Sequence, residues 1–118
     1  MCAMGTVEER LELGVAFKCE GKYDEALAEL NAVLQQEPNH AEARRQLGLV
    51  YGFIGLFDES IQELIVAVQL DPSNLGIRND LALTYTMLGM MDEAKAEFEV
   101  VLSVDPNNDI AKRNMIYF

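Results

Sequence analysis

The sequence is poor in the residues that disulfide frameworks and metal sites need. It holds two cysteines and one histidine among 118 residues. Cys2 and Cys19 are too few to staple a fold, and they do not form a close-spaced metal-binding pair. We therefore expect no metal or other cofactor, and a reducing compartment, by default the cytoplasm.

Positive charge is also scarce, with 9 basic residues against 20 acidic ones and a formal net charge of −11. A field of this sign repels the phosphates of nucleic acids and the anionic face of a membrane. Nucleic acid is therefore a poor candidate partner, and a basic or neutral protein segment suits the charge better. The alternative is that the acid only keeps the surface solvated.

Long apolar runs are missing as well. The longest uncharged and largely apolar run, Leu47 to Phe57, is well short of the roughly 20 residues that a membrane-spanning helix needs. Met1 to Thr6 lead directly into charged residues, where a signal peptide would have an apolar region. We expect no direct membrane insertion, although a tether in a longer parent protein stays open.

The sequence does contain an internal repeat. Aligned to itself with a shift of 34 residues, it agrees in column after column along three lines that begin at Val7, Ala41 and Leu75. The recurring residues include the sets Leu13, Leu47, Leu81; Gly14, Gly48, Ala82; Gly21, Gly55, Gly89; Ala26, Ser60, Ala94; and Pro38, Pro72, Pro106. Such a period predicts stacked supersecondary units.

Each repeat has the pattern of two helices joined by a turn. Apolar residues three and four apart before Gly21 predict an amphipathic first helix, which the glycine ends in the left-handed conformation. Asp24 and Glu25 then open the second helix, where we expect side-chain oxygens to cap free amides and negative charge to suit the helix dipole. Pro38 ends that helix. The first helices are predicted at Val7 to Glu20, Ala41 to Ile54 and Leu75 to Leu88, with the small column at Gly14 facing the one at Ala26.

This pattern strongly resembles the tetratricopeptide repeat (TPR), and the resemblance runs from Val7 through Asn108 without an insertion or deletion. It implies an all-α fold, a right-handed α-solenoid of three helix-turn-helix repeats at residues 7–40, 41–74 and 75–108.

Three arginines stand where the family often has tryptophan: Arg10, Arg44 and Arg78. We expect their stems to cover apolar surface. Their heads are predicted to reach an acidic column of the same period, Glu37, Asp71 and Asp105. They are then packing residues rather than ligand-binding ones.

The two ends of the chain complete a single domain of residues 7–118. Residues 1–6 are an N-terminal extension, and residues 109–118 form a terminal capping helix with Met115 in phase with Leu13. A solenoid cap is normally polar on its outer side, whereas this chain ends in apolar residues. Either the cap docks another copy, which makes a self-assembling homo-oligomer the alternative to partner binding, or the chain is a fragment of a longer array.

In the family, the first helices of successive repeats line a concave groove that binds peptides. By this resemblance, the groove positions that packing does not use include Leu11, Val15, Arg45, Leu49, Phe53, Asn79, Leu83, Met87, Arg113 and Tyr117. The large apolar members form a stripe that is typical of an interaction site. The alternative is that some of them belong to the core.

Tetratricopeptide co-chaperones grip a C-terminal carboxylate with Lys and Asn side chains in the groove. At the corresponding places this chain has Leu11, Val15, Gln46, Gly76 and Asp80. The resemblance therefore implies an adaptor, scaffold or chaperone whose partner protein supplies an apolar or basic-apolar segment rather than an acidic tail.

No set of residues in the sequence suggests catalysis. The single histidine, His40, shares a loop column with Asn74 and Asn108. The recurring acid pairs are explained as helix starts, and there is no phosphate-binding loop. We predict that the protein is not an enzyme.

Overall fold

The computed structural model describes residues 5–118, so Cys2 and most of the extension predicted at residues 1–6 lie outside the described part. Within that part the chain forms helices and no strands. The helices are α1 (Val7–Cys19), α2 (Tyr23–Gln36), α3 (Ala41–Phe53), α4 (Phe57–Leu70), α5 (Leu75–Met87), α6 (Met91–Val104) and α7 (Asp109–Met115). The predicted all-α solenoid is confirmed.

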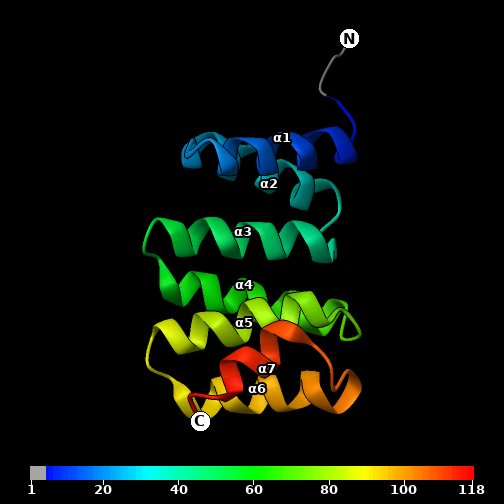
Figure 1. Cartoon of the computed structure of the whole chain (residues 1–118). Helices are drawn as coiled ribbons and strands as arrows, with labels where there is room; N and C mark the ends of the chain where they lie inside the picture. The colour runs from blue at the N-terminus through cyan, green and yellow to red at the C-terminus, as the bar shows by residue number, and fades with distance from the viewer. Residues whose placement is uncertain (1–4) are drawn as a thin grey trace.

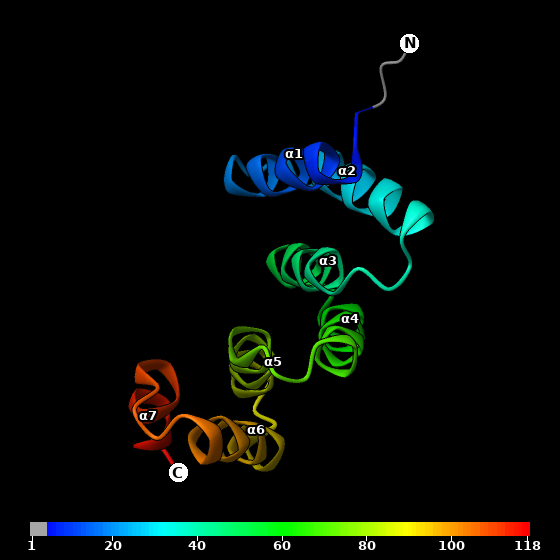
Figure 2. The ribbon, with the colours of Figure 1, turned by 90° about the vertical axis from the view of Figure 1, so that its right-hand side faces the viewer.

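Consecutive helices pair as antiparallel hairpins that stack along one axis (Figure 1). α1 packs on α2, α3 on α4 and α5 on α6, and the second helix of each hairpin contacts the first helix of the next. The molecule measures 52 × 26 × 20 Å. The stack curves, so that α3, α5 and α7 line its inner side while α4 and α6 lie on its outer side (Figure 2).

The turns inside the hairpins use the predicted glycines. Gly21, Gly55 and Gly89 have φ angles of 77°, 86° and 76°, in the region that side chains with a Cβ avoid. Each glycine follows the C-cap of a first helix. The chain therefore reverses direction at the same place in every repeat.

Two kinds of helix start alternate along the chain. The first kind has a side-chain N-cap that accepts a hydrogen bond from a backbone amide in the first turn. His40 caps α3 by accepting from Ala43, Asn74 caps α5 by accepting from Ile77, and Asn108 caps α7 by accepting from Ala111. His40 thus has a structural role in its loop.

The prediction that acids cap the second helices is wrong. The N-cap residues of α2, α4 and α6 are Lys22, Leu56 and Met90, and none of these helices has a side-chain cap. Asp24 and Glu25 lie inside the first turn of α2, so only their interaction with the helix dipole remains.

Each hairpin closes over its small column. A Cβ atom at Gly48 would lie 2.9 Å from Cγ of Leu64 and 3.1 Å from the carbonyl oxygen of Ser60, and one at Gly14 would lie 2.9 Å from Leu30. The small residues are thus required, as predicted. The side chain that lies closest to Gly14 and to Gly48 is a leucine, Leu30 or Leu64, rather than Ala26 or Ser60.

The acidic partners of the three arginines that recur with the repeat were predicted wrongly. The guanidinium groups pair with a glutamate 19 residues onward, on the second helix of the same hairpin: Arg10 with Glu29 at 3.1 Å, Arg44 with Glu63 at 3.0 Å and Arg78 with Glu97 at 2.8 Å. Glu37, Asp71 and Asp105 are instead the C-caps of the second helices. The ion pairs therefore tie the two helices of one hairpin together.

The two ends of the stack differ from the interior. Leu47 and Leu81 are 2% exposed, whereas Leu13 in the same column is 47% exposed because no other hairpin of residues 5–118 packs on that side of α1. At the other end, α7 was predicted to run to residue 118, but it ends at Met115. The ring of Phe118 then lies 6.3 Å from that of Phe98, which places the tail against the last hairpin.

Candidate functional site

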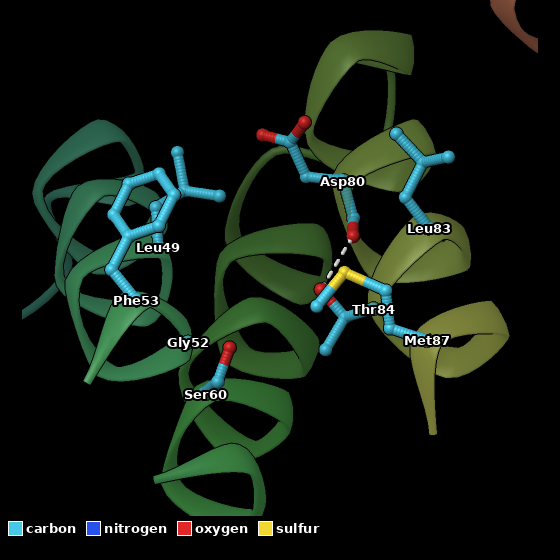
Figure 3. Close-up of a pocket in the computed structure, with 8 residues that line it drawn as sticks. All are labelled: Leu49, Gly52, Phe53, Ser60, Asp80, Leu83, Thr84 and Met87. Atoms are coloured by element: carbon cyan, nitrogen blue, oxygen red, sulfur yellow. Dashed lines mark hydrogen bonds between the residues drawn. The ribbon is translucent and has the colours of Figure 1, made fainter. Parts of the chain in front are cut away.

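Four of the predicted groove residues gather around one pocket between α3 and α5. Leu49 and Phe53 reach it from α3, and Leu83 and Met87 reach it from α5 (Figure 3). Gly52, Ser60, Asp80 and Thr84 complete the wall, with Ser60 supplied by α4. The pocket has a volume of about 210 Å³. Its apolar lining suits an aliphatic or aromatic side chain.

The repeat register explains why the pocket opens at this place. Between α1 and α3, the side chain of Lys18 reaches across and donates to Oε1 of Gln46 at 2.6 Å. The residues 34 positions onward are Gly52 and Asp80, and both line the pocket. Because Gly52 has no side chain to span the gap, the space that Lys18 occupies one repeat earlier is left open.

A chain of polar contacts runs across the inner face beside the pocket. Gln46 donates to Glu42 at 2.7 Å, and Glu42 lies 3.6 Å from the guanidinium of Arg45. Arg45 in turn donates from Nε to Asp80 at 2.5 Å. Burial opposes the charge of Arg45, but the hydrogen bond and charge of Asp80, helped by Glu42, raise its pKa above the ordinary value. The guanidinium is therefore already satisfied within the protein.

The remaining predicted groove residues lie apart from the pocket. Asn79 is only 2% exposed and donates to the side chain of Asn108 at 3.1 Å. The prediction that it faces the groove is therefore wrong, since it is a buried link between α5 and the start of α7. Leu11 packs against the core of the first hairpins, and Val15 is partly buried. Arg113 and Tyr117 are exposed on or just beyond α7.

Ser60 and Thr84 were not predicted as pocket residues. Ser60 was assigned to the small packing column, and Thr84 carries no mark in the sequence. Its hydroxyl donates to the carbonyl of Asp80 at 2.8 Å, so its methyl group is free to face the pocket (Figure 3). Whether such a residue faces the pocket depends on how α3 and α5 are placed relative to each other, and the periodicity of one helix does not encode that placement.

The described residues include neither a cluster of metal-ligating side chains nor a membrane-spanning helix. Within residues 5–118 no group of histidine, cysteine, aspartate or glutamate side chains could hold a metal ion. Over the same residues, no helix combines the length and the apolar character needed to cross a membrane. Cys19 is a free, exposed thiol.

Two family models match the sequence, a TPR repeat over residues 14–55 and a tetratricopeptide repeat over residues 75–108. The chain is a tetratricopeptide-repeat protein. Comparison of this TPR chain with curated proteins finds no significant match in sequence.

Solved TPR structures superpose on nearly all of it. The first TPR of Spaghetti (RPAP3), bound to the HSP90 peptide SRMEEVD, has a TM-score of 0.87 at 23% identity, over 94% of this chain and 88% of that one. The second TPR domain of human RPAP3, in complex with an HSP70 peptide, has a TM-score of 0.79 at 25% identity, over 92% and 93% of the two chains. MamA gives 0.78 at 27% identity, over 86% of this chain and 59% of its own.

Proposed function

We propose that this TPR chain is a protein-interaction module whose pocket between α3 and α5 takes an apolar side chain from a partner polypeptide. The observation that carries the proposal is the pocket itself, walled by Leu49, Phe53, Leu83 and Met87. Phe53 and Met87 remain 61% and 67% exposed, so they offer apolar area that the fold does not use. Tyr117 and Arg113 would lie at the end of the same row of helices.

The partner segment that we propose is apolar or basic-apolar rather than acidic. The HSP90 and HSP70 peptides held by TPR domains of RPAP3 are acidic near their ends. In the present chain the inner-face cations Lys18 and Arg45 are engaged by Gln46 and Asp80, and the net charge is −11. An acidic tail would find few free cations here.

The role that follows is that of an adaptor, scaffold or chaperone without catalytic activity, formed by a domain of residues 7–118. We place it in the cytoplasm because the sequence holds only two cysteines, which is typical of proteins in a reducing compartment. A segment of about nine extended residues would cover the row formed by α1, α3, α5 and α7, at helix spacings of about 10 Å.

The test of the pocket is a substitution that closes it. A lysine introduced as Gly52→Lys should span from α3 toward Asp80, as Lys18 spans from α1 to Gln46. Thr86→Lys is the matched control, because residue 86 has the same register one repeat onward and does not line the pocket. Peptides selected from a random library on the unmodified chain should share a large apolar residue, lose at least about tenfold in affinity for Gly52→Lys, and keep their affinity for Thr86→Lys. Selected peptides that bind all three chains equally would contradict the proposal.

A second candidate function is self-assembly through the tail. It is favoured by the 76% and 71% exposure of Ile116 and Tyr117. Light scattering at several concentrations, on the intact chain and on one ending at Met115, tests it. A dimer that dissociates on dilution and is absent from the shorter chain would support assembly, and a monomer throughout would rule it out.

A further inference from the structure

Exposed apolar side chains concentrate along one edge of the stack. The ends of α3, α5 and α7 and the starts of α4 and α6 lie on this edge, at the left of Figure 1. We call it the turn edge, and we define it by the exposed residues Phe53, Ile54, Leu56, Met87 and Met91, with Ile116 and Tyr117 beyond α7. Within residues 5–118, the other exposed large apolar side chains are Leu13, Val100, Val104, Ile110 and Phe118.

The fold itself does not require an apolar turn edge. In the first repeat, the residues that correspond to Ile54 and Leu56 are Glu20 and Lys22. These two charged side chains are exposed and pair with each other at 3.4 Å. The same turn geometry is therefore compatible with a polar edge at these two positions. The exposed large apolar residues of the edge lie in repeats 2 and 3 and beyond α7, whereas Tyr23, the first-repeat counterpart of Met91, is half-buried.

The turn edge is continuous with the pocket. Phe53 and Met87 line the pocket and are also its most exposed members. Figure 3 shows their side chains on the two sides of the opening, each on the last turn of its helix. A bound segment could place one side chain in the pocket and rest its neighbours on Leu56 and Met91.

Free negative charge flanks this apolar surface. Asp58 and Glu59 follow Leu56 and open α4, and Asp92 and Glu93 follow Met91 and open α6. All four side chains are exposed. None of them forms an ion pair within the described chain. They would attract cationic groups on the flank of a bound segment.

We propose that the turn edge of repeats 2 and 3 docks a basic amphipathic helix of a partner protein, with an apolar face on the edge and in the pocket, and Lys or Arg beside the carboxylates. A helix fits better than an extended strand, because the edge consists of helix ends and offers no backbone ladder for a strand to join. A second copy of this chain fits poorly, because it would bring two rows of carboxylates together. The inference rests on the proposed function of the pocket and extends that site outward.

The probe is a fluorescent synthetic peptide of about 18 residues with Leu along one helical face and Lys along the other. A peptide of the same composition, permuted so that no apolar face forms, separates surface docking from general attraction between charges. Fluorescence anisotropy at several salt concentrations measures both. We expect the amphipathic peptide to bind at least about tenfold more tightly than the permuted one.

Paired variants locate the binding surface. Leu56→Ser with Met91→Ser should weaken binding about tenfold, and Ser is a favoured N-cap, so the start of α4 should tolerate it. The control is Val100→Ser with Val104→Ser, which removes apolar residues that are at least about as exposed from the last part of α6. Asp58→Asn with Asp92→Asn should weaken binding severalfold and reduce its salt dependence. The matched control is Glu8→Gln with Asp109→Asn, which removes the same charge from the first turns of α1 and α7. This control should change neither the affinity nor its salt dependence.

The outcomes separate the two proposals. If Leu49→Glu in the pocket abolishes binding while the turn-edge variants bind normally, the pocket function stands and the turn-edge inference is wrong. If neither pocket nor edge variants differ from the unmodified chain, or if the amphipathic peptide does not bind at all, the turn-edge inference is wrong, and the comparison of Gly52→Lys with Thr86→Lys on library-selected peptides still decides the pocket function. A concentration-dependent dimer that Leu56→Ser with Met91→Ser disrupts would assign the edge to a second copy and overturn the inference.

Discussion

At the residue scale, two glycines on α3 differ in whether the neighbouring helix leaves room for a Cβ atom. A Cβ at Gly48 would lie 2.9 Å from Cγ of Leu64, whereas one at Gly52 would lie 3.4 Å from Oγ of Ser60. We expect Gly48→Ala to lower the free energy of unfolding by about 1 to 2 kcal/mol, because overpacking outweighs the gain in helix propensity. Gly52→Ala should leave it unchanged or raise it by up to about 1 kcal/mol. Urea unfolding measures both, and equal stabilisation would contradict the close approach of α3 and α4.

Tyr51 and Tyr85 provide a test of burial through pH. Burial, together with Glu63 and Glu59, raises the pKa of Tyr51 above its ordinary value, and burial with the matching glutamates one repeat onward raises the pKa of Tyr85. Above about pH 10 the unfolded chain therefore loses these protons before the folded chain does. We expect the free energy of unfolding to fall as the pH rises through this range, and to fall less steeply in Tyr51→Phe with Tyr85→Phe. Urea titrations at a series of alkaline pH values give the two slopes, and identical slopes would be the contrary result.

Sequence reasoning at this scale predicted which faces are buried better than which atoms meet. The period of 34 residues correctly marked Arg10, Arg44 and Arg78 as packing residues, but it offered two acidic columns of the same period. The structure selects the glutamates 19 residues onward because they lie across the hairpin, as with Arg44 and Glu63. Choosing between such columns requires the distance between two helices, which no single helix encodes.

At the element scale, the position of a helix in the stack decides the value of its apolar residues. Leu13 and Leu47 occupy the same column, but Leu13 is 47% exposed and Leu47 is 2% exposed. We expect Leu47→Ala to cost about 3 kcal/mol in the free energy of unfolding and Leu13→Ala to cost about 1 kcal/mol or less. Chemical denaturation measures both. A similar cost at both sites would mean that something covers Leu13 in solution, and light scattering would show whether that is another copy.

The starts and ends of the first helices were largely predictable, because the residues that mark them act locally, whereas the capping of the second helices was predicted wrongly. The expected ends of the first helices, Glu20, Ile54 and Leu88, are their C-caps. The terminal helix was less predictable. Its phase indicated helix to residue 118, yet it ends at Met115, where Phe118 gains a contact with Phe98. A tertiary contact of this kind overrides local propensity.

At the scale of the whole molecule, the pocket arises from a break in the repeat rather than from the repeat itself. Three in-phase copies predicted a stack with an apolar inner stripe, and Leu49, Phe53, Leu83 and Met87 do lie together. The stripe does not continue through the first helix, since Leu11 packs against the core of the first hairpins and Val15 is partly buried. The opening follows from Gly52 standing in the column of Lys18. Departures from a repeat are therefore the more informative positions for locating a site.

The stacked architecture also predicts a gradient of local stability. Each hairpin contacts only its neighbours, and α7 is a short helix at the end of the stack that packs on the last hairpin. In such a solenoid the ends open without the centre. We expect amide hydrogen exchange at the same pH to be at least about tenfold slower in α3 and α4 than in α7, which corresponds to about 1.4 kcal/mol in opening free energy. Protection that is uniform from α1 to α7 would show that the chain opens only as a whole. Removing Phe118 should speed exchange further in α7 and leave α3 unchanged, because the contact between Phe118 and Phe98 lies at the C-terminal end of the stack.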